Sequence, residues 1–194
     1  MPKLIGINKI NIAVFISGNG SNLKNLIFDS LKKKSKYKIN LVISDKATAK
    51  GLRYARKFKI KKKIINYLNK KNAEKNILVE LKKNKIDLVC LAGFMKILSN
   101  DLIKKFKGKI LNIHPSLLPK YKGLNTHQRA INNKEKFAGC TVHYVNSRLD
   151  SGKIILQKKV KILKTDSSIT LAKRILIQEH ILYPKALKKV LINL

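Results

Sequence analysis

Residues 11–22 read NIAVFISGNGSN, an uninterrupted apolar run followed by a turn that contains two glycines. Such a run is typical of a strand that is buried on both faces of a parallel sheet. Beyond the turn, Leu23, Leu26, Ile27 and Leu31 recur at the spacing of one helix face. The segment therefore predicts a strand, a glycine-rich turn and a helix in succession.

The same alternation continues along the chain. We expect strands over residues 39–44, 63–66, 86–92 and 110–114, and helices over residues 51–59 and 73–84. A short helix should follow Ser99, which is a favourable N-terminal capping residue. Alternating strands and helices predict an α/β fold of the Rossmann-like type, with a mostly parallel sheet and helices on both faces.

The pattern changes after Phe137. Residues 141–145 and 153–160 indicate two strands joined by a turn, so we expect an antiparallel strand near the C-terminal end. A helical segment starts at Asp166, and Pro184 is expected to kink or restart it. No linker, repeat or secretory signal interrupts the pattern, so residues 1–194 are predicted to form a single domain.

The charge of the chain is extreme, with 44 Lys and Arg against 10 Asp and Glu and a net charge of +34. Such a balance raises the question of a nucleic-acid partner. However, only five of these cations are Arg, the usual bidentate reader of phosphates and bases, and the lysines occur on almost every polar face. We therefore expect a bias in composition with non-specific polyanion binding, and no specific nucleic-acid partner.

Other features of the composition point to a cytoplasmic protein. No apolar run reaches the roughly 18 residues that a membrane span needs, so we expect no membrane association. Cys90 and Cys140 each lie in an apolar segment, which predicts reduced and buried thiols. No set of His, Cys, Asp and Glu shows a metal-ligand spacing, so no metal is expected.

The turn at residues 17–22 can bind an anion. Its glycines let backbone N–H groups approach a phosphate, and the start of the following helix favours negative charge. The spacing matches neither the dinucleotide fingerprint nor a Walker loop, so a small monophosphate fits best. The alternative is a tight turn in which Ser21 or Asn22 caps the helix.

A second group of residues can carry acid–base chemistry. Asn112 and His114 should point to the same face at the C-terminal end of a parallel strand, where α/β folds bind ligands. An amide and an imidazole together can hold a developing oxyanion and move a proton. Asp150 should lie nearby, where its carboxylate would orient the imidazole and favour its protonated form. The alternatives are a strand-end pair satisfied by loop carbonyls and a turn residue at Asp150.

Two further positions remain open on the sequence alone. Glu179 sits among apolar residues of the last helix and could accept sugar hydroxyls, but a solvated helix acid is the more common situation. His143 alternates with apolar residues in its strand, so we assign it mainly a structural role near the site.

These segments together resemble one family, the folate-dependent phosphoribosylglycinamide formyltransferases. The matching motifs are SGNGSNL, LAGFMKIL, LNIHPSLLPKYKGL, the turn at residues 149–152, IILQKKV and QEH with the following Tyr-Pro. The resemblance implies the formyltransferase fold and transfer of a formyl group from 10-formyltetrahydrofolate, as co-substrate, to the amine of N1-(5-phospho-D-ribosyl)glycinamide in purine (IMP) biosynthesis. Small-molecule substrates and a monomer or weak homodimer are expected.

The resemblance also implies roles for individual residues. The catalytic set would be Asn112, His114 and Asp150. The ribonucleotide would be bound by Gly20, Ser21, Asn22, Pro115, Gln178 and Glu179. The folate would be bound by Asn112, Asp150, Met95, Lys96, Ile97, Leu98, Asn146, Ser147, Arg148, Leu149 and, on a looser alignment, Lys71. The family often has Arg where this chain has Lys96, which would weaken the folate contact.

Two kinds of alternative remain. A formyltransferase that acts on aminoacyl-tRNA would use the positive charge, although such relatives carry a further C-terminal domain, and formyltetrahydrofolate hydrolases carry an N-terminal one. A polyanion-binding protein derived from the same fold would not be expected to keep Asn112, His114 and Asp150 together.

Overall fold

The computed structural model describes residues 9–192 and contains one seven-stranded sheet in the order β3-β2-β1-β4-β5-β6-β7. Its elements, in chain order, are β1 (Ile10–Ile16), α1 (Ser21–Ser30), β2 (Tyr37–Ser44), α2 (Leu52–Lys57), β3 (Lys61–Ile64), α3 (Lys70–Lys83), β4 (Leu88–Leu91), α4 (Asn100–Lys105), β5 (Lys109–His114), α5 (Thr126–Asn132), β6 (Phe137–Tyr144), β7 (Ile154–Lys161) and α6 (Ser168–Leu191). The ends of the predicted single domain, residues 1–8 and 193–194, lie outside the described residues.

The sheet is parallel from β3 to β5, whereas β6 pairs antiparallel with β5 and β7 pairs antiparallel with β6. This arrangement confirms the predicted mostly parallel sheet with an antiparallel end. After β3 the chain crosses to the other side of β1 to form β4, so the strand order reverses between β1 and β4. Such a reversal opens a crevice at the carboxyl ends of the strands.

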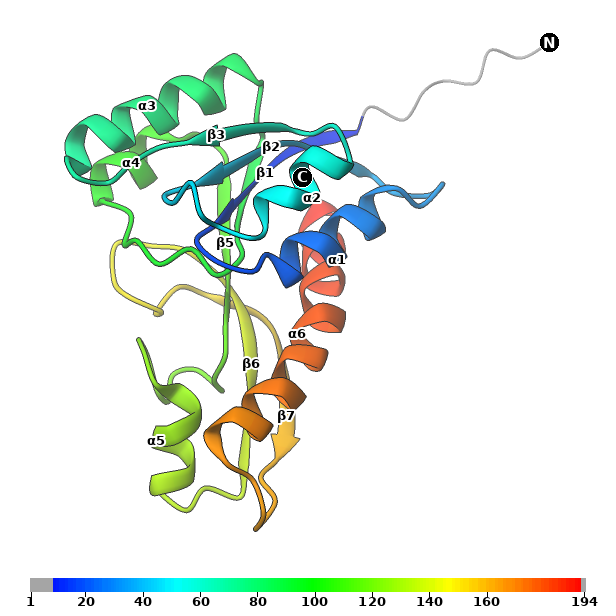
Figure 1. Ribbon diagram of the computed structural model, residues 1–194, viewed down its shortest axis with the longest axis vertical. Helices are drawn as coiled ribbons and strands as arrows, with labels where there is room; N and C mark the ends of the chain where they lie inside the picture. Colours follow the sequence, from blue (N-terminus) through cyan, green and yellow to red (C-terminus); the bar gives the residue numbers. More distant parts are fainter. Residues whose placement is uncertain (1–8, 193–194) are drawn as a thin grey trace.

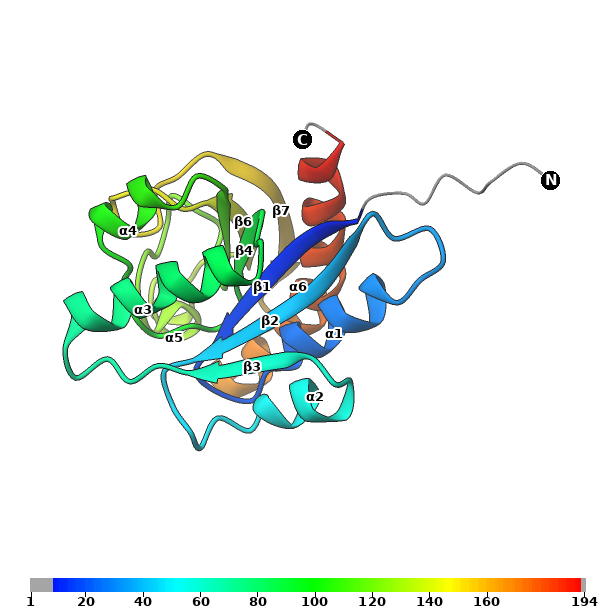
Figure 2. The same cartoon turned by 90° about the horizontal axis from the view of Figure 1, so that it is seen from above.

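Helices cover both faces of the sheet, as predicted (Figures 1 and 2). Alternate residues of β1 enter different cores: Ile12, Val14 and Ile16 pack with α1, α2, α5 and α6, whereas Ala13 and Phe15 pack with α3 and α4. This alternation explains the unbroken apolar run at residues 11–16, because a strand with two covered faces has no solvent side. Cys90 and Cys140 are both buried free thiols, as predicted.

Several element boundaries differ from the sequence prediction. The α2 and β4 elements are shorter than expected, β3 starts two residues earlier, and β6 starts at Phe137 rather than at residue 141. The α3 helix starts at Lys70 because the Asn69 side chain accepts a hydrogen bond from the backbone of Asn72. Ser99 caps α4, as predicted.

The expected restart of the last helix at Pro184 is wrong, because α6 continues through this residue to Leu191. Tyr183, Ala186 and Leu187 are fully buried around it, so packing against the sheet holds the helix across the missing N–H group. Within residues 9–192, no helix combines the length and apolar character needed to cross a membrane.

Candidate active site

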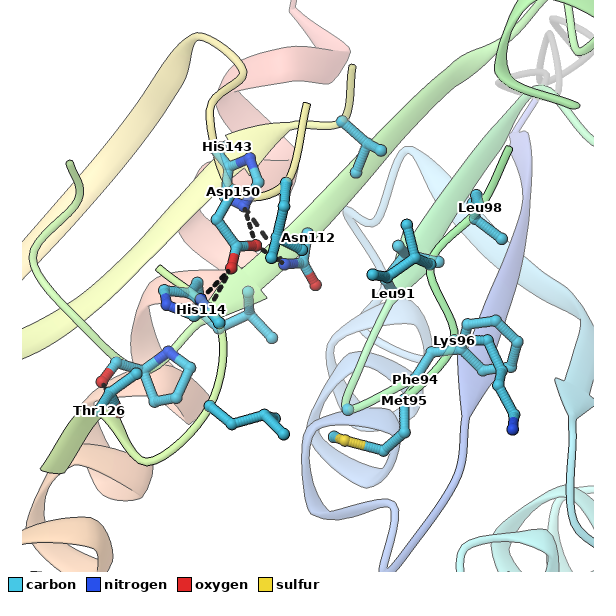
Figure 3. Close-up of a pocket in the computed structure, with 18 of the residues that line it drawn as sticks. Leu91, Phe94, Met95, Lys96, Leu98, Asn112, His114, Thr126, His143 and Asp150 are labelled. Carbon is cyan, nitrogen blue, oxygen red and sulfur yellow. Dashed lines mark hydrogen bonds and ion pairs between the residues drawn. The ribbon is translucent and has the colours of Figure 1, made fainter. Parts of the chain in front are cut away.

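Most of the predicted site residues surround one cavity of about 520 Å³. The carboxyl ends of β4 and β5 form its floor, and the loops after β4, β5 and β6 form its walls (Figure 3). Asn22 of α1 and Glu179 of α6 also line it. The cavity lies beside the reversal in strand order, which is the usual ligand site of an α/β sheet.

Asp150 contacts both of the other residues that were predicted to be catalytic. Asn112 and His114 occupy alternate positions of β5, so their side chains leave the same face of the sheet. Oδ2 of Asp150 lies 3.3 Å from Nδ1 of His114, and Oδ1 of Asp150 lies 3.4 Å from the amide nitrogen of Asn112. The alternative that Asn112 and His114 are satisfied only by loop carbonyls is therefore wrong.

Asp150 is held in an unusual backbone conformation, with φ at 44°. This left-handed region is uncommon for a residue other than glycine. Contacts with a distant segment stabilise this conformation. The backbone N–H of Gly123 donates a hydrogen bond of 2.9 Å to Oδ2 of Asp150. The carboxylate thus binds a loop and two strand residues, and the alternative that it serves only its own turn is wrong.

The carboxyl group of Asp150 is stabilised in its charged form. Burial alone would raise its pKa, but His143, the N–H of Gly123 and His114 together hold the pKa below its ordinary value. Asp150 is therefore a carboxylate at neutral pH and acts as a fixed negative charge beneath the cavity.

Two opposing effects act on the pKa of His114. Asp150 favours the protonated ring, as predicted, and the Tyr121 carbonyl acts in the same direction. Burial outweighs both contributions, so the pKa of His114 lies below its ordinary value. The carbonyl of Tyr121 lies 2.9 Å from Nε2 and requires a proton there, so Nδ1, beside Asp150, is the position where His114 gains or loses a proton.

The predicted anion turn leads directly into α1, which begins at Ser21. Gly20 has φ at 70°, and a Cβ atom there would lie 2.6 Å from the Cα of Gly51, so glycine is required for both conformation and space. No side chain caps the helix, so the alternative that Ser21 or Asn22 acts as a cap is wrong. The first N–H groups of an α-helix lack partners inside the helix, which suits an anion.

Glu179 is buried, with 8% of its surface exposed, and its Oε2 accepts a hydrogen bond of 2.7 Å from the side chain of Asn22. Burial raises its pKa to about 7, and the bond from Asn22 opposes this effect only in part. The alternative of a solvated helix acid is therefore wrong. Glu179 instead presents a carboxyl group to the cavity.

The cavity gathers most, but not all, of the predicted residues. Those that line it are Asn22, Met95, Lys96, Ile97, Leu98, Asn112, His114, Pro115, Asn146, Ser147, Arg148, Leu149, Asp150 and Glu179. Those that do not are Gly20, Ser21, Lys71 and Gln178. Gln178 is one residue from Glu179, and the rotation of about 100° per helix residue turns it away from the cavity. Lys71 is exposed in the first turn of α3, on the other face of the sheet.

Sequence reasoning missed the loop that leads into α5. Gly123, Leu124, Asn125, Thr126 and His127 all line the cavity. Part of this loop lies in the motif that ends in KGL, which was the available signal. His143 lies near the site, as predicted, and its Nε2 is 3.2 Å from the Asn112 amide nitrogen.

The chain is similar to known formyltransferases along nearly its whole length. Residues 10–187 match the family model described as formyl transferase. The phosphoribosylglycinamide formyltransferase of Escherichia coli (strain K12) is 42% identical over 178 residues, which are 90% of this chain and 84% of that protein. The crystal structure of phosphoribosylglycinamide formyltransferase from Brucella melitensis has a TM-score of 0.89 and 44% identity, with 94% of this chain and 95% of that chain covered.

A larger relative shows the same similarity over one part of its length. The human trifunctional purine biosynthetic protein adenosine-3 is 44% identical over 185 residues, which are 94% of this chain. The chain spans only 18% of the length of that protein.

Proposed function

The chain belongs to the formyl transferase family, and we propose that it transfers the formyl group of 10-formyltetrahydrofolate to the amine of N1-(5-phospho-D-ribosyl)glycinamide, a step of IMP biosynthesis. One observation carries this proposal. The contacts among Asn112, His114 and Asp150 lie in a single cavity whose lining is polar near Asn22 and Glu179 and apolar near Met95 and Ile97. Such a cavity can bind a polar and an apolar ligand side by side, with their reacting atoms next to residues that can transfer a proton.

The polar side of the cavity suits the ribonucleotide. The start of α1 offers backbone N–H groups to a phosphate, and Glu179 can accept hydrogen bonds from ribose hydroxyl groups. Pro115, the residue after His114, also lines the cavity. Gly20 and Ser21 would bind the phosphate through their backbone N–H groups. Gln178 and Lys71 do not line the cavity, so a direct contact with either substrate is not proposed for them.

The opposite side suits a flat, largely apolar ligand. Met95, Ile97, Leu124 and Leu149 line the cavity although 49–74% of each residue's surface is exposed to solvent. Large exposed apolar side chains gathered at one opening are typical of a ligand or partner site. We assign this side to the pterin and aminobenzoyl groups of the folate.

The reaction needs three events over the catalytic trio. The amine nitrogen attacks the formyl carbon, the bond from that carbon to N10 of the folate breaks, and one proton moves from the amine to N10. His114 can exchange a proton at Nδ1, where Asp150 stabilises the charged ring. Protonated His114 would donate to the oxygen that becomes negative in the tetrahedral intermediate, and the amide of Asn112 would contact the reacting groups beside it.

The aminoacyl-tRNA alternative and the polyanion-binding alternative have less support. The relatives of similar length are named phosphoribosylglycinamide formyltransferases, and they are 42–44% identical to this chain. The single domain, the monomer or weak homodimer and the cytoplasmic location remain proposals.

Within residues 9–192, no group of three or more His, Cys, Asp or Glu is arranged to hold a metal ion.

The deciding experiment is product analysis with the purified chain. We expect tetrahydrofolate and formylglycinamide ribonucleotide to appear in equal amounts when 10-formyltetrahydrofolate and glycinamide ribonucleotide are supplied. Formylation of a charged tRNA without formylation of glycinamide ribonucleotide would favour the first alternative. Release of formate in place of transfer would favour a hydrolase.

A further inference from the structure

The amide group of Asn112 is oriented by its neighbours. Its nitrogen faces two acceptors, Nε2 of His143 at 3.2 Å and Oδ1 of Asp150 at 3.4 Å. The amide nitrogen carries two hydrogens, so these two contacts use both of them. The amide oxygen therefore points away from this pair, into the open part of the cavity between His114 and Met95 (Figure 3).

The orientation depends on which nitrogen of His143 carries the proton. Nδ1 of His143 lies 2.7 Å from the carbonyl oxygen of Tyr144, and a carbonyl can only accept a hydrogen bond. The proton of the neutral ring is therefore on Nδ1, and Nε2 offers a lone pair. That lone pair is what accepts the N–H of Asn112.

The resting orientation has a consequence for the reaction. With its oxygen in the cavity, Asn112 can accept an N–H of the attacking amine, but it cannot donate to the oxygen of the tetrahedral intermediate. Donation requires the amide to turn over, and a turned amide would place its oxygen against Nε2 of His143 and Oδ1 of Asp150. Lone pairs would then face each other at both contacts, so the two neighbours keep the amide oxygen in the cavity.

We propose that His143 is a positioning residue that decides which end of the Asn112 amide faces the substrates. The ring, with its proton on Nδ1, holds the amide nitrogen of Asn112 and turns the amide oxygen into the cavity. This inference rests on the proposed function, because it assigns the amide oxygen to capture of the attacking amine.

Nuclear magnetic resonance of the substrate-free protein tests the orientation directly. We expect the ¹⁵N resonances of neutral His143 to show a protonated Nδ1 and an unprotonated Nε2. The side-chain amide resonances of Asn112 should shift with the same midpoint as Nε2 when the pH is lowered. The His114→Gln variant lacks the other nearby imidazole, so the resonances of Asn112 and His143 should also be recorded in that variant. A neutral ring protonated at Nε2, or an Asn112 amide that does not respond to His143, would overturn the proposal.

Kinetics test the consequence with a matched pair of variants. His143→Leu removes the ring nitrogens and should lower kcat about tenfold or more, with KM for both substrates changed less than about threefold. Glutamine can present either an oxygen or an N–H to Asn112, so His143→Gln should recover kcat to within about threefold of wild type. A leucine variant with over half of wild-type kcat, or a folded glutamine variant no better than leucine, would contradict the assignment.

The nuclear magnetic resonance and kinetic experiments test different claims, so one can fail while the other succeeds. If the wild-type chain formylates no glycinamide ribonucleotide, the proposed function is wrong, and the resonances of Asn112 and His143 still report whether the two side chains are coupled.

Discussion

Asn22, in the first turn of α1, donates a 2.7 Å hydrogen bond to Glu179, in the middle of α6, although 157 residues separate them in the chain. Both side chains are buried, and both line the cavity. The bond places a carboxyl group with a pKa of about 7 beside the proposed phosphate site. The pair therefore links the packing of α1 on α6 to the proposed ribonucleotide site.

Glu179 should make the stability of the protein depend on pH. Its pKa is raised from 4.5 to about 7 by burial, so the folded state holds a proton that the unfolded state has lost. The resulting stability is fully present below pH 4.5 and is lost as the pH rises through 7. Urea unfolding between pH 4 and 8 should show the wild-type protein losing about 3 kcal/mol more than Glu179→Gln. Parallel pH profiles for the two proteins would contradict the prediction.

Replacing His114 should affect the chemical step. His114→Ala removes the group that exchanges a proton beside Asp150, and kcat should fall by roughly 10² or more. The apolar side of the cavity is untouched, so folate affinity should change little. Steady-state kinetics with both substrates measure the two effects, and a variant that keeps over half of wild-type kcat would rule out the assigned role.

A negative charge at the start of α1 should weaken ribonucleotide binding. Asn22→Asp places a carboxylate beside the proposed phosphate site and removes the donor to Glu179. KM for the ribonucleotide should rise while KM for the folate stays near normal, because like charges repel over short distances. Asn132→Asp makes the same change at an exposed position of α5 and should alter neither constant. Equal weakening of both substrates would mean that the α1 turn has another role.

Salt should separate the basic surface from the chemistry. Scattered lysines bind RNA or DNA by releasing counterions, so such binding should show no sequence preference and should vanish at about 0.3 M salt. Formyl transfer to glycinamide ribonucleotide should persist there, because directed N–H groups at the start of α1 hold the phosphate. Parallel assays of transfer and of fluorescent-RNA binding give the comparison. Loss of turnover together with RNA binding would favour the aminoacyl-tRNA alternative.

The sequence predicts what depends on local patterns. The apolar run in β1, the glycine turn before α1 and the alternation of Asn112 with His114 each follow from periods of two or 3.6 residues. These patterns were enough to predict that Asn112 and His114 lie at the carboxyl end of one strand. An antiparallel strand near the C-terminal end was also predicted, and the pairing of β5 with β6 carries Asp150 toward His114.

The features that the sequence did not predict depend on contacts between distant segments. Nothing local in QEH distinguishes a buried Glu179 from a solvated one, because its burial requires α1 to lie against α6. The role of His143 depends on the register that pairs it with Asn112, which no local pattern contains. The lowered pKa of His114 reflects the depth of its burial, which outweighs the opposing hydrogen bond to the Tyr121 carbonyl.

The two outermost strands carry a further consequence of the lysine-rich composition. All of β3 is exposed, and Lys61, Lys62 and Lys63 lie on it; at the opposite end of the sheet, Lys158, Lys159 and Lys161 are exposed on β7. An unpaired strand is a template for the backbone of another chain, and lysine side chains prevent such pairing by mutual repulsion. An edge-to-edge contact between two copies of this protein would bring these lysines together. Their mutual repulsion opposes the growth of intermolecular sheets in a concentrated solution.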